Sequence, residues 1–140
     1  AEGNVTHGRV VIDDYAHHPD ELRASISSVK ALYPGRELTV AFQPHLYTRT
    51  RDFAEGFAEA LDLADEVILL DIYPARELPI EGVTSQIIFD RLKCEKKLLI
   101  RREDLTKTVK NRNFEILLTA GAGDIADLVP EVVKALESNG

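Results

Sequence analysis

Five short runs of consecutive apolar residues restrict the fold of this chain more than any other feature of its sequence. Apart from Arg9 and Thr39, apolar residues fill each run, and they do not alternate with polar ones. That pattern is typical of strands that are covered on both faces, as in a parallel sheet. We therefore predict strands at residues 9–12, 38–42, 67–70, 98–100 and 116–118.

Helical patterns separate these runs. Pro19 suits the first position of a helix because its missing N–H needs no partner there, and the apolar stripe after it comprises Leu22, Ile26, Val29 and Leu32. A second helix is predicted with Thr50 as its N-cap, and its stripe comprises Phe53, Phe57, Leu61 and Ala64.

Three further helices are predicted at residues 85–92, 103–110 and 124–138. Pro130 requires the last one to begin later than residue 124 or to kink. With right-handed crossovers, the order of elements predicts an α/β fold. We expect a Rossmann-like, doubly wound, mostly parallel sheet of five to six strands with helices on both faces, forming a single domain over residues 1–140.

Composition and charge exclude several classes of partner. The 140 residues include 17 Lys and Arg against 24 Asp and Glu, a net charge of −7, which disfavours binding to nucleic acid. No apolar run approaches the roughly 18 residues that would span a bilayer, so we expect no membrane partner. The single Cys94 fits a cytoplasmic location. Because the chain contains no methionine, we expect it to be part of a longer protein.

Polar and ionisable residues crowd the segments that follow the predicted strands. Ligands of parallel sheets bind beyond the carboxyl ends of the strands, so these segments predict a functional site at that edge. They read DDYAHHP at residues 13–19, QPHLYTRT at 43–50, DIY at 71–73 and GAGD at 121–124.

Other functions fit these residues less well. His17, His18, His45 and Asp14 could ligate a metal, but their spacing does not fix a geometry, so no metal site is predicted. A response-regulator receiver would use two acidic residues after the first strand and Asp71 after the third, but it also needs a lysine after the fifth strand, which is absent.

Phosphate-binding motifs are also incomplete. The turn at residues 121–124 lacks the full GxGxxG pattern. Two interpretations of it therefore stand side by side: a tight turn capped by Asp124, or a direct contact with a ligand. No GxxxxGK[ST] motif occurs, so the chain carries no P-loop. A non-catalytic module that binds a nucleotide or an acidic metabolite at the same edge is the alternative from another functional class.

Residues 13–19 and 42–52 closely resemble the C-terminal domain of the Mur ligases, the amide-forming ligases of peptidoglycan synthesis. Residues 71–77, 79–85 and 121–124 are similar as well, and the likeness covers essentially the whole chain. Leu46 stands where many family members have arginine. The resemblance implies a third, Rossmann-like domain that closes over the site, and the domains that bind the UDP-sugar and ATP would be absent here.

The resemblance implies an ATP-dependent reaction that joins L-alanine to UDP-N-acetylmuramate through an acyl phosphate, with Mg²⁺ offsetting the phosphate charge. ATP and Mg²⁺ would be bound mainly by the absent central domain, so the isolated domain is expected to be inactive. The related ligase that recycles murein tripeptide is the alternative, but it shares only the first motif and not residues 45–50.

The resemblance also assigns site residues. A histidine, either His17 or His45, would orient the amine of L-alanine or take its proton, and Arg49 offers a planar fork for the carboxylate. The implied substrate-binding set is Tyr15, His17, His45, Arg49, Gly121, Gly123 and Asp124. The implied nucleotide contacts are Asp14, Tyr15 and Tyr47.

Overall fold

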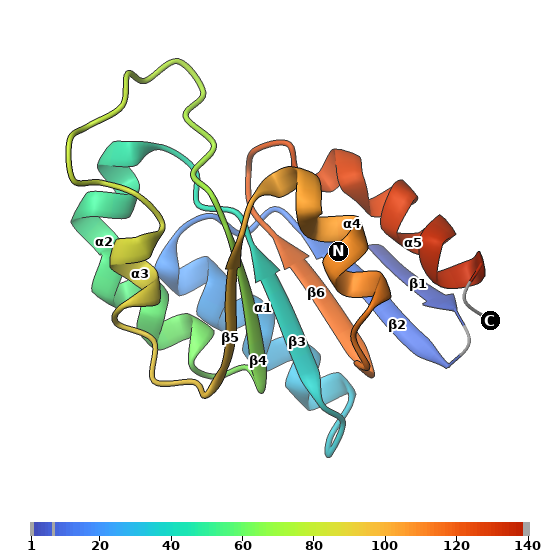
Figure 1. Cartoon of the computed structure of the whole chain (residues 1–140). Coiled ribbons are helices and arrows are strands. Elements are labelled where there is room, and N and C mark those ends of the chain that lie inside the picture. Colours follow the sequence, from blue (N-terminus) through green and yellow to red (C-terminus); the bar gives the residue numbers. More distant parts are fainter. Residues whose placement is uncertain (1, 7, 139–140) are drawn as a thin grey trace.

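A six-stranded sheet forms the centre of the protein, whose computed structural model describes residues 2–6 and 8–138 (Figure 1). The strands lie in the order β1-β2-β6-β3-β4-β5. All adjacent pairs are parallel except β1 with β2, which is antiparallel. The predicted mostly parallel α/β fold is therefore confirmed. The bounds are β1 (Glu2–Thr6), β2 (Arg9–Asp14), β3 (Leu38–Phe42), β4 (Glu66–Leu70), β5 (Lys96–Ile100) and β6 (Ile116–Ala120).

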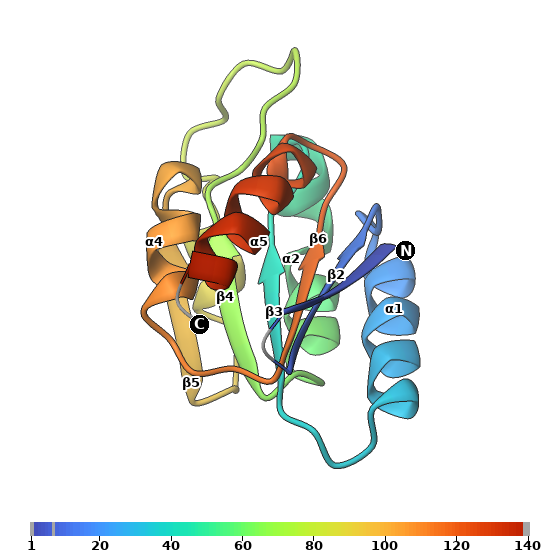
Figure 2. The same ribbon diagram turned by 90° about the vertical axis from the view of Figure 1, so that its right-hand side faces the viewer.

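Helices cover both faces of the sheet (Figure 2). They are α1 (Pro19–Leu32), α2 (Tyr47–Leu61), α3 (Gln86–Phe89), α4 (Leu105–Lys110) and α5 (Val129–Ser138), with 3₁₀ turns at Arg102–Asp104 and Ile125–Leu128. Successive strand residues alternate between the two cores: Val10 and Ile12 pack with α1 and α2, whereas Val11 packs with α4 and α5. This two-sided burial explains why the strands read as continuous apolar runs.

Three details of the predicted helices are wrong. Thr50 is not the N-cap of α2 but lies within its first turns, and its hydroxyl donates to the Leu46 carbonyl at 2.8 Å. Phe53 interrupts α2 with non-helical φ/ψ angles of −122° and 20°, and it is 46% exposed rather than buried. Leu32 also leaves its predicted stripe, because it ends α1 and is 71% exposed.

Other boundaries also differ from the sequence pattern. The predicted helices at 85–92 and 103–110 are shorter, since only Gln86–Phe89 and Leu105–Lys110 are α-helical. The last helix begins at Val129, directly before Pro130, as one of the two expected outcomes. β5 is an edge strand and is not covered on both faces, because Leu99 is 37% exposed.

The carboxyl ends of β2, β3, β4 and β6 meet at one edge of the sheet, where the segment between β4 and α3 projects beyond α2 (Figure 1). The parallel pairing forces this arrangement, so the chemically distinctive loops become neighbours. Across the described part of the chain, none of the helices has the length and apolar character needed to cross a bilayer.

Candidate functional site

Two histidines and an arginine come together where the loops after β2 and β3 meet. The ring centroids of His17 and His45 lie 6.3 Å apart, edge to face. Arg49 lies beyond His45, with its Nη1 atom 3.1 Å from His45 Nδ1. Together these residues form the His17–His45–Arg49 cluster. Two imidazoles and one guanidinium thus share one region of the sheet edge.

His17 is fixed by the turn that leads into α1. Its Nδ1 lies 2.9 Å from the carbonyl oxygen of Tyr15. Because a carbonyl oxygen can only accept, Nδ1 carries the proton in the neutral ring and Nε2 keeps its lone pair. Glu21 accepts the backbone N–H groups of His17 and His18 at 3.2 and 3.1 Å, and the first of these bonds is the main cause of the lowered pKa of Glu21. The turn therefore presents a nitrogen that can accept a proton.

His45 is held by the segment that follows β4. His45 and Tyr73 form an isolated parallel bridge. The Leu46 N–H donates to the Tyr73 carbonyl at 2.9 Å, and the Tyr73 N–H donates to the Pro44 carbonyl at 2.8 Å. The His45 and Tyr73 rings also stack, with centroids 5.7 Å apart and planes at 14°. Residues after β4 therefore orient a side chain that follows β3.

The contact with Arg49 fixes the tautomer of His45. A guanidinium can only donate, so His45 Nδ1 accepts and Nε2 carries the proton of the neutral ring. Burial lowers the pKa of His45, and the charges of Arg49 and His17 lower it further, against an opposing effect of Glu77. His45 is therefore uncharged at neutral pH, and Arg49 supplies the charge of this pair.

The lowered pKa of His45 predicts a titration below its ordinary value of 6.5. Arg49→Ala should move the pKa toward 6.5 without reaching it, because burial is the larger cause and remains. NMR of the His45 ring against pH measures both. Since the folded state binds this proton less readily than the unfolded state, His45 should also reduce stability as the pH falls below 6.5.

Arg23→Ala is the matched control for this titration. Arg23 is an exposed arginine of α1 that pairs with Glu59 at 3.7 Å, so its removal should leave the His45 titration unchanged. A His45 pKa above 6.5 in the unmodified chain, or equal shifts in the two variants, would contradict the assigned causes.

The turn after β6 packs closely against its neighbours. Gly121 has a φ of 145°, a conformation that favours glycine. A Cβ at Gly123 would lie 2.5 Å from Gln43 Oε1 and 2.6 Å from Tyr73 Cγ. Glycine at 123 is therefore required for the approach of three loops to one another. The contact of Gly121 and Gly123 with substrate stays a prediction.

Asp124 belongs to a polar network that joins the ends of several strands. Gln43 donates to Asp124 Oδ1 at 2.6 Å and accepts the Ile125 N–H at 3.0 Å. Arg102 Nε lies 2.7 Å from Asp124 Oδ2, and the Arg102 N–H donates to Asp71 at 3.0 Å. Both carboxylate oxygens of Asp124 thus have partners within the protein. Asp124 fixes this loop, and its predicted substrate contact stays a prediction.

Asp14 organises the turn that follows β2. Its carboxylate accepts the Ala16 N–H at 3.1 Å and the Ser25 hydroxyl at 2.6 Å. Asp14 and Tyr15 line a groove of about 610 Å³ beside α1, and Tyr15 is 69% exposed. Tyr15 is therefore accessible to a nucleotide, whereas the Asp14 carboxylate already has two partners within the protein. The nucleotide contacts of both residues stay predictions.

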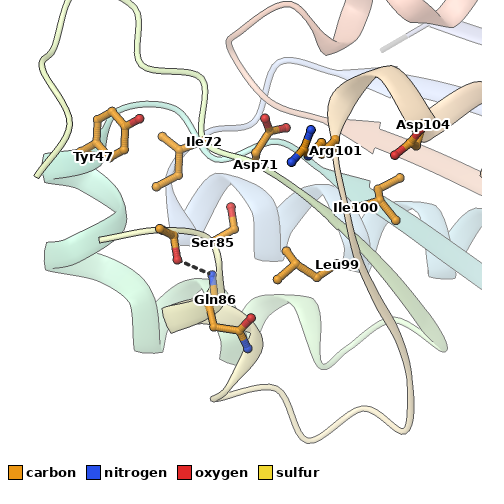
Figure 3. A pocket seen from close by; sticks show the side chains of 10 residues that line it. Tyr47, Asp71, Ile72, Ser85, Gln86, Leu99, Ile100, Arg101 and Asp104 are labelled. Carbon is orange, nitrogen blue, oxygen red and sulfur yellow. Dashed lines mark hydrogen bonds between the residues drawn. The ribbon is translucent and has the colours of Figure 1, made fainter. Parts of the chain in front are cut away.

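Tyr47 lies apart from the His17–His45–Arg49 cluster. It lines a cavity of about 490 Å³ between the ends of β4 and β5, together with Asp71, Ile72 and Arg101 (Figure 3). Residues two apart on a helix are rotated by about 200° from each other, so Tyr47 and Arg49 point to different sides of α2. The predicted nucleotide contact of Tyr47 stays a prediction, but Tyr47 and Arg49 do not share one hollow.

Within residues 2–6 and 8–138, no three His, Cys, Asp or Glu side chains are placed to hold a metal ion together. The Mg²⁺ that the sequence resemblance implies therefore has no cluster of three such ligands among the described residues, and its binding mainly by another domain stays a prediction.

Three residues of this region received no role from the sequence pattern: Gln43, Tyr73 and Glu77. Gln43 had one signal, its place directly after β3 in the polar segment 43–50, and its side chain is only 2% exposed. Tyr73 and Glu77 act on α2 and the loop before it from about 30 residues away, and no local pattern indicates such a contact.

Comparison with known proteins gives a consistent family. Residues 3–126 match the family described as "Mur ligase, glutamate ligase domain". The chain is similar to the UDP-N-acetylmuramate–L-alanine ligases of Flavobacterium johnsoniae (52% identity over 130 residues) and Parabacteroides distasonis (59% over 127 residues). These matches cover 93% and 91% of this chain but only 29% and 28% of the two relatives.

Solved structures agree in fold. The crystal structure of UDP-N-acetylmuramate-alanine ligase from Thermotoga maritima matches 94% of this chain and 27% of its own, with 31% identity and a TM-score of 0.74. The MurF ligase of the same organism, solved in complex with ADP, matches 99% of this chain and 31% of its own, with 20% identity and a TM-score of 0.67.

Proposed function

The chain belongs to the Mur ligase family, and we propose that it is the C-terminal domain of an ATP-dependent UDP-N-acetylmuramate–L-alanine ligase. Relatives that are 52% and 59% identical to it over 130 and 127 aligned residues are named UDP-N-acetylmuramate–L-alanine ligase, and the chain spans less than a third of their length. In such an enzyme, this domain would hold the incoming L-alanine. The rest of the enzyme would bind UDP-N-acetylmuramate and ATP, in the cytoplasm.

The carboxylate of L-alanine needs a fixed cation, and Arg49 meets that need. Its planar guanidinium can bind both oxygens of a carboxylate. The bond to His45 uses Nη1 and leaves the other guanidinium nitrogens for a ligand. His45 would therefore aim the guanidinium through its Nδ1 atom. Because Leu46 has no charge, Arg49 carries this contact without an arginine at 46.

His17 is the proposed acceptor of the amine proton. The amine of L-alanine must lose its charge before it can attack an acyl group. His17 Nε2 keeps its lone pair because Nδ1 faces the Tyr15 carbonyl, whereas the lone pair of His45 already faces Arg49. The two histidines thus take different roles, His17 as the base and His45 as the residue that orients Arg49.

ATP, held by the rest of the enzyme, would supply the phosphoryl group that converts the muramoyl carboxylate into an acyl phosphate. The ADP complex of the MurF relative supports a nucleotide in this family. The task of this chain is to hold the amine close to the reacting carbon and to help exclude water, which suits a domain that closes over the site.

The observation that carries this proposal is the meeting of His17, His45 and Arg49 from two separate motifs. The test is phosphate release by the whole-length protein that contains this chain. We expect release only when ATP, UDP-N-acetylmuramate and L-alanine are all present. The isolated 140-residue chain should release none, because it has no P-loop.

Murein tripeptide in place of L-alanine is the matched substrate control. Phosphate release that depends on the tripeptide and not on L-alanine would favour the recycling ligase. Release by the isolated chain, or release that needs no amine at all, would count against the proposal as a whole.

A further inference from the structure

Helix α2 begins without a cap of its own. Its N-cap residue, Leu46, has no side chain able to accept a hydrogen bond and adopts a φ of 75°. The first turn of α2 contains no acidic residue. A helix leaves its first N–H groups without partners inside the helix, so something else must bind those of Tyr47 and Thr48.

Glu77 supplies those partners from a different part of the chain. Its Oε1 accepts the N–H of Tyr47 at 2.5 Å and that of Thr48 at 3.2 Å. Its Oε2 accepts the Thr48 hydroxyl at 2.5 Å. One carboxylate therefore makes three bonds to the first turn of α2, although 29 or 30 positions separate it from that turn.

The backbone places Glu77 firmly. The Glu77 N–H donates to the Pro74 carbonyl at 2.9 Å, which closes a turn that includes Ala75 at a φ of 54°. That turn follows directly on Tyr73, whose bridge to His45 ties this segment to the loop before α2. The segment after β4 thus binds the chain on both sides of Leu46: Tyr73 bonds to the loop before it, and Glu77 bonds to the first turn of α2 after it.

We infer that Glu77 is a positioning residue that holds the first turn of α2, and with it Arg49, in the orientation that receives the carboxylate of L-alanine. The inference rests on the proposed function for its substrate but not for its geometry. Arg49 lies in the turn that Glu77 caps, and the bonds of Glu77 go to backbone and hydroxyl groups. The guanidinium of Arg49 is therefore left for His45 and a ligand.

Electrostatics agree with this role. The Thr48 hydroxyl bond is the main cause that lowers the pKa of Glu77, and the backbone bonds and the charge of Arg49 add to it. Glu77 is therefore ionised at neutral pH, and a negative charge is stabilising at a helix N-terminus. The Arg49 guanidinium therefore lies near the Glu77 carboxylate, although the hydrogen bonds of that carboxylate go to Tyr47 and Thr48.

Kinetics of the whole-length ligase test the substrate side. Because small misplacements of a binding group cause large losses, Glu77→Ala should lower kcat/KM for L-alanine by about tenfold, while the KM for ATP stays within about twofold. Glu115→Ala is the matched control. Glu115 also accepts a backbone N–H, from Glu37 at 2.8 Å, and an arginine N–H, from Arg36 Nε at 2.7 Å. It directly precedes β6 and therefore lies at the amino ends of the strands, away from the site.

Amide hydrogen exchange of this chain tests the geometry without any substrate. Glu77→Ala should speed amide exchange at Tyr47 and Thr48. Glu77→Gln keeps an acceptor oxygen, so it should speed exchange at these amides less. The glutamine variant also serves as the test if the alanine variant does not fold. Exchange at these amides as slow as in the unmodified chain would overturn the inference, as would equal kinetic losses in the Glu77 and Glu115 variants. If the unmodified whole-length protein fails to use L-alanine, the proposed function fails, while exchange still decides the role of Glu77.

Discussion

Replacing Arg49 by alanine in the whole-length ligase is expected to lower kcat/KM for L-alanine by about 30- to 5,000-fold, which corresponds to about 2–5 kcal/mol of lost transition-state binding. The reason is that the substrate carboxylate would be left in a closed site without its cation. Most of the loss should be a raised KM for L-alanine, because the carboxylate is held both before and during the reaction. Steady-state kinetics with varied L-alanine measure this effect.

Two further variants sharpen this experiment. Arg49→Lys keeps the charge but not the planar fork, so its loss should fall between those of the unmodified enzyme and the alanine variant. Arg51→Ala removes an exposed arginine from the same helix, one that pairs with Asp52 at 2.9 Å, and should leave L-alanine kinetics unchanged. Equal losses at positions 49 and 51 would refute the assignment of Arg49.

Arg112→Met is expected to lower the free energy of unfolding of this chain by about 3 kcal/mol, because it leaves a buried carboxylate without its cation. That carboxylate is Glu66, the first residue of β4, which is only 3% exposed. Glu66 accepts the Thr39 hydroxyl at 3.0 Å and pairs with the Arg112 guanidinium. Urea unfolding at pH 7 measures the change.

The double variant Glu66→Gln/Arg112→Met separates the lost ion pair from lost packing. A glutamine at 66 can still accept the Thr39 hydroxyl bond and leaves no buried charge, so the double variant should be more stable than Arg112→Met alone. Arg23→Met, at the exposed pair with Glu59, should cost less than about 1 kcal/mol. A double variant as unstable as the single one would show that burial of an unpaired charge is not the cause.

The core strands could be predicted from the sequence because both of their faces are buried. Val10, Val11 and Ile12 face alternate cores and are all apolar, so their run is visible in the sequence without any knowledge of the partners. The same reasoning fails at the margins. Leu99 reads as a core residue but lies on an edge strand, and Phe53 reads as part of a helical stripe but lies at a kink.

The site residues divide in the same way. His17 and His45 stand in loops after the parallel strands β2 and β3, and Arg49 stands in the first turn of α2 that follows, so their proximity follows from the fold class. The tautomers of the two histidines and the directions of the three side chains do not follow from the fold class. Tyr47 and Arg49 are two positions apart in one motif, yet the helical rotation of α2 sends Tyr47 toward a separate cavity.

The sequence by itself determined the alternation of strands and helices, the edge at which the site lies and the family motifs, because these depend on local apolar patterns and on residue identity. Only the tertiary structure decided that Glu77 caps α2 and that Gln43 and Arg102 share Asp124. Those contacts join segments that are far apart in the chain, so their geometry depends on how the elements pack and not on any neighbouring residue.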